Sequence, residues 1–276
     1  MLSAPPPTGP PWDLPLSEVP LAFIDLEMTG LNAEKDRVVE ICIERVRGLA
    51  TDAPREDGID TLVCPEDGAK GNVHVHGIDA EALASAPKFQ DIASDVVRIV
   101  DGAILVAHAA EWDVRFLAME LSRAGRPLQI VHYIDTLVLA RRAFAQKSYS
   151  LANLCVALGI ERGRAHRAAP DVAAMRHVFY RAVQVLAPVS ARDLWEVRIA
   201  ERRARAAIVS ACEAAVEHAA PVLLTYRPAR RSPEAMVMVL TEVRADLDPP
   251  RVIGYQLPGR GRRELRADRI LRVDPH

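Results

Sequence analysis

The stretch that decides the fold is FIDLEMTGL, residues 23–31. It begins as an apolar run and then places two carboxylates, Asp25 and Glu27, two positions apart. Along an extended strand, side chains two positions apart point to the same face of a sheet. Two neighbouring carboxylates raise each other's pKa unless a cation neutralises them, and such hard oxygen ligands suit Mg²⁺ or Mn²⁺. The stretch therefore predicts a strand that ends at a divalent metal site.

Two later segments carry polar residues that fit the same site. AHAAEWDVRFL (107–117) contains Asp113, and HRAAPD (166–171) contains His166 and Asp171. The two aspartates would complete a set of four acidic ligands, and an imidazole that titrates near neutral pH is a suitable general base. Taken singly, each aspartate is more often a turn cap or a partner of arginine. The prediction of a catalytic site therefore rests on the joint pattern.

In this order and spacing, the three segments resemble the motifs of the DEDDh superfamily of 3′–5′ exonucleases. That group includes the proofreading epsilon subunit of bacterial DNA polymerase III, ribonuclease T and oligoribonuclease. Three connecting segments resemble the proofreading branch as well: VHGI (75–78), IDTLVLARR (134–142) and YSLANLCVALGI (149–160). The resemblance covers residues 19–188. It implies a ribonuclease-H-like α/β fold, in which helices flank a mixed sheet.

The resemblance also implies a mechanism with two ions of Mg²⁺ or Mn²⁺. Asp25 would bridge the ions, and Glu27 and Asp171 would complete the first site with the attacking water. Asp113 would hold the second ion through water, and His166 would take the proton from the attacking water. Two metals can place the nucleophile and stabilise the charge on the phosphate in the transition state.

Substrate contacts with the 3′ terminal nucleotide are expected from the residues that match the family's clamp: Met28, Thr29, Gly30, His76 and His108. Two of them have an alternative role. Thr29 could instead cap its own turn, and His108 could support the site without touching the substrate. The family usually has Asn after this histidine, whereas this chain has Ala109. The change predicts weaker substrate contacts without loss of activity.

Hydrophobic periodicity predicts alternating strands and helices after a meander of three antiparallel strands. The expected strands are 21–26, 38–46, 59–63, 103–107 and 130–134. The expected helices are 89–100, 112–124, 136–144, 151–158 and 171–185. We expect residues 1–18 to be a disordered, proline-rich leader and residues 19–188 to be the exonuclease domain.

A second domain is predicted beyond Pro188. Residues 189–220, rich in Ala, Arg and Glu, are expected to form a helical linker, and 221–276 a small β-barrel-like domain with strands at 222–226, 236–243, 252–257 and 270–273. LLTYR, VIGYQL and RELRADRILRV (263–273) resemble the Sm-like WYL domain. The Trp-Tyr pair that names that family is replaced here by Pro250 and Arg251.

Charge and composition bound the class of protein. Residues 1–190 carry 19 Lys and Arg against 25 Asp and Glu, whereas residues 191–276 carry 16 Arg against 12 acidic residues. A basic end beside an acidic domain is typical of a protein that binds nucleic acid. No apolar run approaches the length of a membrane span, and the four cysteines lie far apart. These features predict a cytoplasmic protein with reduced thiols and no membrane partner.

The predicted function is a metal-dependent exonuclease that releases nucleoside 5′-monophosphates from 3′ ends, with single-stranded DNA favoured over RNA. Its partner would be nucleic acid, with a polymerase or regulatory partner as a possible ligand of the C-terminal region. Two alternatives stay open. One is an exoribonuclease, and the other is a regulatory protein that senses nucleic acid or a ligand on a weakly active nuclease fold.

Overall fold

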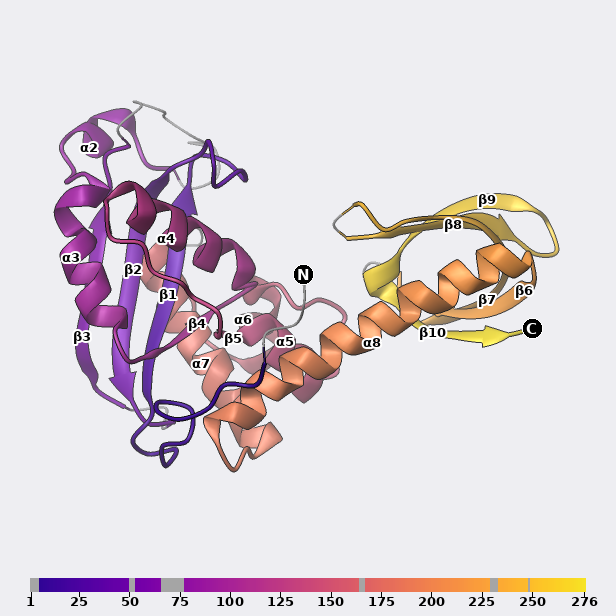
Figure 1. The fold of residues 1–276 in the computed structure, drawn as a ribbon, viewed down its shortest axis with the longest axis horizontal. Coiled ribbons are helices and arrows are strands. Elements are labelled where there is room, and N and C mark those ends of the chain that lie inside the picture. The colour runs from indigo at the N-terminus through magenta and orange to yellow at the C-terminus, as the bar shows by residue number, and fades with distance from the viewer. Residues whose placement is uncertain (1–4, 50–52, 66–76, 164–166, 229–232, 248) are drawn as a thin grey trace. The chain divides into compact units, whose positions relative to one another are not determined.

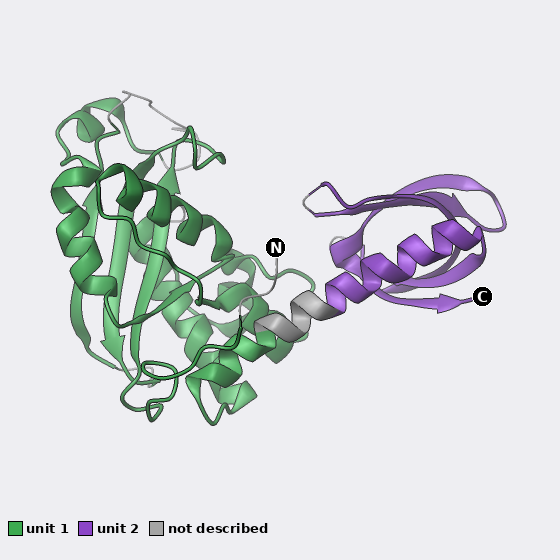
Figure 2. Ribbon diagram, in the orientation of Figure 1, with its two compact units in different colours: residues 1–198 green, residues 199–276 purple. Residues whose placement is uncertain are grey.

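The structure, a computed structural model, describes residues 5–49, 53–65, 77–163, 167–228, 233–247 and 249–276 (Figure 1). The chain divides into two compact units, residues 1–198 and 199–276 (Figure 2). Each unit has its own hydrophobic core. The fold class matches the prediction: a mixed five-stranded sheet with helices is followed by a five-stranded antiparallel sheet.

The sheet of unit 1 has the order β3-β2-β1-β4-β5. The strands are β1 (Pro20–Met28), β2 (Val38–Arg47), β3 (Arg55–Leu62), β4 (Ile104–Ala107) and β5 (Ile134–Asp135). The first three strands form the expected antiparallel meander, and β4 and β5 join parallel to β1. Strand β1 thus lies in the middle of the sheet, where both of its edges are paired.

Helices cover both faces of this sheet (Figure 1). On one face lie α3 (Phe89–Val100) and α4 (Glu111–Arg123), and on the other lie α5 (Thr136–Ala143), α6 (Leu151–Leu158) and α7 (Ala168–Leu186). The short helix α2 (Ala80–Ala84) precedes α3. Most helix ends agree with the sequence periodicity, and α7 begins three residues earlier than predicted because Pro170 lies within its first turn, where its missing N–H costs nothing.

Strand β1 alternates between the two layers of helices. Ala22, Ile24 and Leu26 belong to the core formed with α3 and α4. Phe23 points to the other layer, where its ring lies 5.3 Å from that of Phe179 and 6.0 Å from that of Tyr180 on α7. The alternation continues along the strand, so that the next side chains on the α7 face are carboxylates.

The N-terminal segment differs from the disordered leader that the sequence predicts for residues 1–18. Residues 9–18 form turns against unit 1, and Trp12 is only 6% exposed. The ring of Trp12 contacts that of His132 edge to face, and His132 in turn contacts Trp195. Prolines reduce the conformational entropy of the unfolded chain, so less entropy is lost when the segment becomes ordered. Burial of one large apolar side chain, Trp12, can therefore be enough to order a proline-rich segment.

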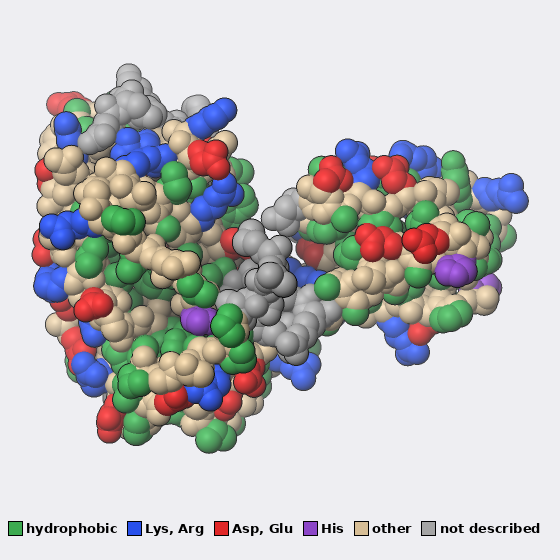
Figure 3. All heavy atoms as spheres, viewed as in Figure 1, with side chains coloured by type: hydrophobic (Ala, Val, Ile, Leu, Met, Phe, Trp, Pro, Cys, Tyr) green, Lys and Arg blue, Asp and Glu red, His purple; other side chains and the backbone are tan. Residues whose placement is uncertain are grey.

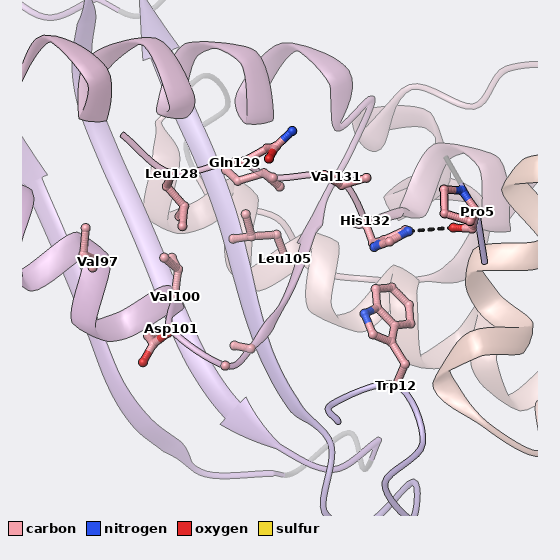
Figure 4. A pocket seen from close by; sticks show the side chains of 13 residues that line it. Pro5, Trp12, Val97, Val100, Asp101, Leu105, Leu128, Gln129, Val131 and His132 are labelled. Atoms are coloured by element: carbon pink, nitrogen blue, oxygen red, sulfur yellow. Dashed lines mark hydrogen bonds between the residues drawn. The ribbon is translucent and has the colours of Figure 1, made fainter. Parts of the chain in front are cut away.

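Beside Trp12, the chain lines a pocket of about 400 Å³ between α3 and the segment before β5 (Figure 4). Val97, Val100, Leu105 and Leu128 form its apolar wall, and His132 Nε2 bonds to the carbonyl oxygen of Pro5 at 2.8 Å. The predicted strand at 130–134 is wrong over most of its length. Leu128 and Ile130 are apolar because they pack on the core, whereas β5 pairs with β4 at only two positions.

Unit 2 begins within helix α8 (Ala191–His218). Its antiparallel sheet has the order β10-β6-β7-β8-β9. The strands are β6 (Pro221–Tyr226), β7 (Glu234–Arg244), β8 (Arg251–Gln256), β9 (Gly261–Arg266) and β10 (Ile270–Pro275), with a 3₁₀ turn, η1 (Ala267–Arg269), before the last. Sequence analysis missed β9, GRRELR, because four of its six residues are charged and only Leu265 is buried.

Among the described helices, none has the length and apolar character that a membrane span requires. The four cysteines are free thiols, and Cys42, Cys155 and Cys212 are buried.

Trp12→Ala should lower the free energy of unfolding by roughly 3 kcal/mol, because it empties a buried aromatic site. Trp112, which is 40% exposed, provides the control, and Trp112→Ala should cost less. Denaturant titrations of the two variants measure the difference. Equal losses would mean that the N-terminal segment is not anchored by Trp12.

Candidate active site

Three carboxylates meet at the end of β1. Ligand oxygens of Asp25, Glu27 and Asp171 all lie within 4.8 Å of one another. Asp25 and Glu27 extend from the α7 face of β1, and Asp171 lies in the first turn of α7. The structure thus brings together three of the four predicted acidic ligands in one cluster.

Asp113 reaches the same end of β1 from the opposite layer. It lies in the first turn of α4 and its Oδ1 accepts a hydrogen bond from the backbone N–H of Leu26 at 3.1 Å. Burial raises the pKa of Asp113 to about 8. Burial, and then the neighbouring charge of Asp113, raise the pKa of Asp25 well above its ordinary value. The two aspartates therefore share one poorly solvated, negatively charged region.

Glu27 faces a second glutamate across the β1–β2 pair. Its register partner on β2 is Glu40, which is 2% exposed. Burial, followed by the charges of Glu40 and Asp171, raises the pKa of Glu27 to about 7. Glu40 is compensated by Arg167, whose Nη2 lies 2.8 Å from Oε1, and by the backbone N–H of Ala168 at 3.2 Å. Glu40 thereby fixes the start of α7, a role that sequence analysis missed because it depends on the strand register.

Asp171 also has a basic partner. Arg162 donates from Nε to Oδ1 and from Nη2 to Oδ2, both at 2.7 Å. Both side chains are largely shielded, with 15% of Arg162 and 9% of Asp171 exposed. Sequence analysis did not identify Arg162, and its spacing of nine residues from Asp171 carries no signal for a contact.

Cys42 lies next to the cluster. It is the register partner of Asp25 on β2 and is 1% exposed, and opposed side chains of an antiparallel pair lie on the same face. Burial raises the pKa of its thiol far above the ordinary range, and the nearby acidic groups add to the effect.

The His108 ring lies under the site and bonds within the protein. Its Nδ1 lies 2.9 Å from the Thr136 hydroxyl and its Nε2 lies 3.0 Å from the carbonyl oxygen of Tyr149. Burial lowers the pKa of His108, which favours the neutral ring with Nε2–H donating to Tyr149. Both nitrogens are engaged within the protein, which fits the supporting role that the sequence analysis gives as an alternative; a contact of His108 with substrate stays a prediction.

Ala109 adopts a left-handed backbone conformation, with φ of 60°. Its N–H donates to Asp135 Oδ1 at 3.1 Å, and the same oxygen accepts from Leu137 N–H at the start of α5. Asn and Gly tolerate this conformation better than Ala. The left-handed backbone conformation thus explains the Asn that the family usually carries at this position without requiring that the Asn contacts substrate.

The turn after Glu27 is held by its own side chains. The Thr29 hydroxyl accepts from Arg37 N–H at 2.9 Å and lies 3.4 Å from Asp36 Oδ1. Gly30 lies against the carboxylate of Asp36: a Cβ there would lie 2.5 Å from Oδ2, so the Asp36 side chain would have to move. Met28 packs against the core. Thr29 therefore caps its turn, and contacts of Met28, Thr29 and Gly30 with a nucleotide stay predictions.

His166 and His76, the predicted general base and one predicted substrate contact, lie outside the described residues. Their roles likewise stay predictions.

Comparison with known proteins decides the family. The RNase_T model, described as exonuclease, matches residues 22–179. The chain belongs to this exonuclease family. The DNA polymerase III subunit epsilon of Treponema pallidum is 32% identical over 168 residues, which cover 58% of this chain and 75% of that protein. The PolC-type DNA polymerase III of Thermotoga petrophila is 28% identical over 192 residues. These residues cover 67% of this chain but only 13% of that polymerase.

A solved structure adds the fold. The zinc-bound complex of E. coli exonuclease I with single-stranded DNA aligns with a TM-score of 0.56 and 16% identity, over 87% of this chain and 55% of that chain. Family membership confirms the predicted catalytic class, a 3′–5′ exonuclease that hydrolyses phosphodiester bonds. It also implies divalent metal ions, and the cluster fits them: its donors are carboxylate oxygens, and the nearby arginines offset their mutual repulsion only in part.

The metal-free protein should lose stability as pH rises. Glu27 and Asp113 have higher pKa values in the folded protein than in the unfolded chain, so the folded state holds extra protons between about pH 4 and pH 8. Their stabilising effect is complete below that range and is lost as pH rises through 7 to 8. Thermal melts in a chelator from pH 5 to pH 9 measure the fall. Glu27→Gln should reduce it, and an unchanged curve would contradict the assignment.

Ala109→Gly should raise the free energy of unfolding by about 0.5–1 kcal/mol, because it relieves the left-handed strain. The neighbouring Ala110 has φ of −54°, so Ala110→Gly should instead destabilise by a similar amount. Denaturant titrations of both variants give the comparison. A loss of stability in Ala109→Gly would argue against strain at this position.

Proposed function

We propose that the protein is a metal-dependent 3′–5′ exonuclease that removes nucleoside 5′-monophosphates from single-stranded DNA. The observation that carries the proposal is the cluster of Asp25, Glu27 and Asp171 at the end of β1, with Asp113 beside it. Its assignment to DNA rests on the similarity to the DNA polymerase III subunit epsilon and to exonuclease I in complex with single-stranded DNA.

The side chains have distinct roles in this proposal. Asp25, Glu27, Asp113 and Asp171 hold two divalent cations, Mg²⁺ or Mn²⁺, and His166 takes the proton of the attacking water. When bound, the cations supply the positive charge that stabilises the phosphate in the transition state. Glu40 and Arg167 hold the start of α7 and so keep Asp171 in place. His108 and Asp135 support the backbone behind the site.

RNA is the alternative substrate, because discrimination depends on how the site treats the 2′-hydroxyl. Met28, Thr29, Gly30 and His76 are the proposed contacts with the 3′ nucleotide. Labelled DNA and RNA of one sequence, incubated with Mn²⁺, distinguish the two proposals by which strand becomes shorter.

Unit 2 is proposed to hold the strand. The exonuclease I alignment covers 87% of this chain, more than the 198 residues of unit 1, so the fold likeness extends into unit 2. On one face of its sheet, Tyr255 is 43% exposed and opposes Arg262 on β9. An exposed aromatic ring beside a cation is the combination that binds single strands. Figure 3 shows basic and acidic side chains interspersed on the side of unit 2 that is in view.

The biological role is proposed to be DNA repair or turnover by a stand-alone enzyme. The Arg-containing sheet of unit 2 supports this over a polymerase subunit, and a polymerase or regulatory partner for unit 2 remains the alternative. The likeness of unit 2 to the WYL domain stays a proposal. Its support is the antiparallel sheet together with the quoted sequence segments.

Asp25→Asn should abolish nuclease activity and leave the fold intact, because it removes a metal ligand and relieves repulsion in the cluster. Melting of the metal-free variant should be unchanged or higher than that of the parent. Activity in Mg²⁺ within tenfold of the parent, at equal melting temperature, would contradict the assignment of Asp25.

Tyr255→Ala and Arg262→Gln should weaken binding of a long single strand, measured with catalysis blocked by Asp25→Asn in each protein. Loss of one phosphate contact should reduce the slope of log affinity against log salt by about 0.7 for Arg262→Gln, whereas Tyr255→Ala should leave the slope unchanged. Arg272→Gln, which removes an arginine already paired with Asp274, is the control. Equal affinities in all variants would exclude this face as the strand-binding surface.

A further inference from the structure

Arg162 places a guanidinium directly against the carboxylate cluster. It follows α6, which ends at Gly159 with φ of 64°, and precedes α7, which carries Asp171. Its guanidinium binds both oxygens of that aspartate at 2.7 Å. A bidentate pair of this kind is among the stronger side-chain interactions in proteins.

The contact conflicts with metal binding. Asp171 offers one ligand atom to the group whose oxygens lie within 4.8 Å of one another, and both of its oxygens are held by Arg162. A divalent cation that takes one of these oxygens must share it with the guanidinium or displace it. In both cases the positive charge of the guanidinium remains close to the incoming cation. The repulsion between the two charges lowers the affinity of the site for the cation.

Arg162 also acts on the rest of the cluster. The hydrogen bonds to Asp171 raise the pKa of the Arg162 guanidinium, and the charge of Asp25 adds to this. In return, the charge of Arg162 partly offsets the rise in the pKa of Glu27. The guanidinium therefore supplies part of the positive charge that a cation would otherwise provide.

Arg167 makes a useful contrast. Its partner is Glu40, which lies outside the cluster of ligand atoms, so the pair can persist when metal binds. Arg162, by contrast, donates both of its hydrogen bonds to Asp171, a member of the cluster.

We propose that Arg162 is the counter-ion of the metal-free site, that it competes with the divalent cation for Asp171, and that it thereby sets the metal affinity. The inference rests on the proposed function, because it requires that the cluster binds a divalent cation. Arg162 acts through Asp171 and does not contact substrate in this proposal: its guanidinium occupies both carboxylate oxygens before metal binds, and it is displaced when a cation takes one of them.

The test is calorimetric titration of the full chain with Mn²⁺, without substrate. Arg162→Gln removes the charge and the bidentate contact, and its dissociation constant for Mn²⁺ should be about tenfold lower than that of the parent. Arg162→Lys keeps the positive charge but loses the bidentate contact with Asp171. Its dissociation constant should therefore lie between those of the parent and of Arg162→Gln. The rise in melting temperature with Mn²⁺ should be largest for Arg162→Gln.

Arg176 provides the matched control. It lies on α7 and pairs with Glu44 at 2.6 Å, with 18% and 17% of the two side chains exposed, but Glu44 is not a member of the cluster. Arg176→Gln should therefore bind Mn²⁺ like the parent. A similar gain in Arg176→Gln would show that the effect is a general loss of positive charge and would overturn the proposal.

An Arg162→Gln constant equal to that of the parent would overturn the competition, and a higher constant would mean that Arg162 prepares Asp171 for the metal. If Arg162→Gln does not fold, the constant of Arg162→Lys decides in the same way. If neither the parent nor the variants bind Mn²⁺, the proposed function itself fails, and this inference fails with it. If the parent binds Mn²⁺ and the variants bind it with the same dissociation constant, this inference fails but the proposed function does not.

Discussion

The packing of Phe23 on Phe179 is the contact on which the site depends. β1 rises about 3.3 Å per residue and α7 about 1.5 Å per residue. The four residues from Phe23 to Glu27 along β1 therefore cover about the same distance as the eight residues from Phe179 back to Asp171 along α7. Since Asp25, Glu27 and Asp171 cluster at the far end, the strand and the helix run in opposite directions past each other. A shift of one residue in β1 would turn its carboxylates to the opposite face.

This arrangement works against folding. It concentrates carboxylates where water is scarce, and burial makes their ionisation unfavourable. The chain compensates unevenly. Glu40 is neutralised by Arg167 and a helix start, and Asp171 by Arg162. The hydrogen bonds that lower the pKa of Asp113 come from backbone N–H groups, those of Leu26 and of Asp113 itself. Burial and four neighbouring carboxylates raise the pKa of Asp25, the residue that the family resemblance assigns to both ions.

Much of this could be predicted from local sequence. The alternation in FIDLEM indicates which side chains share a face, and the amphipathic pattern from Phe89 to Val100 predicts its helix to the residue. What failed depends on long-range packing. Glu40 becomes part of the site through a strand register, and Arg162 through the path of a loop. The strand GRRELR escaped because its charged residues lie at the edge of a sheet, where polar side chains are tolerated. Ala109 could be noticed as a departure from the family, but its left-handed φ could not.

The position of Cys42 has a consequence for how the dynamics of this site can be followed. Its thiol is buried against Asp25 in the central strand pair and is held in the unreactive, protonated form. Alkylation at this position requires β1 and β2 to separate, so in rapid opening and closing the labelling rate measures the free energy of that local separation. Cys42 is thus a native thiol beside the carboxylate cluster, and its labelling rate with and without a divalent cation reports, without any introduced probe, whether the cation stabilises the pairing of β1 with β2.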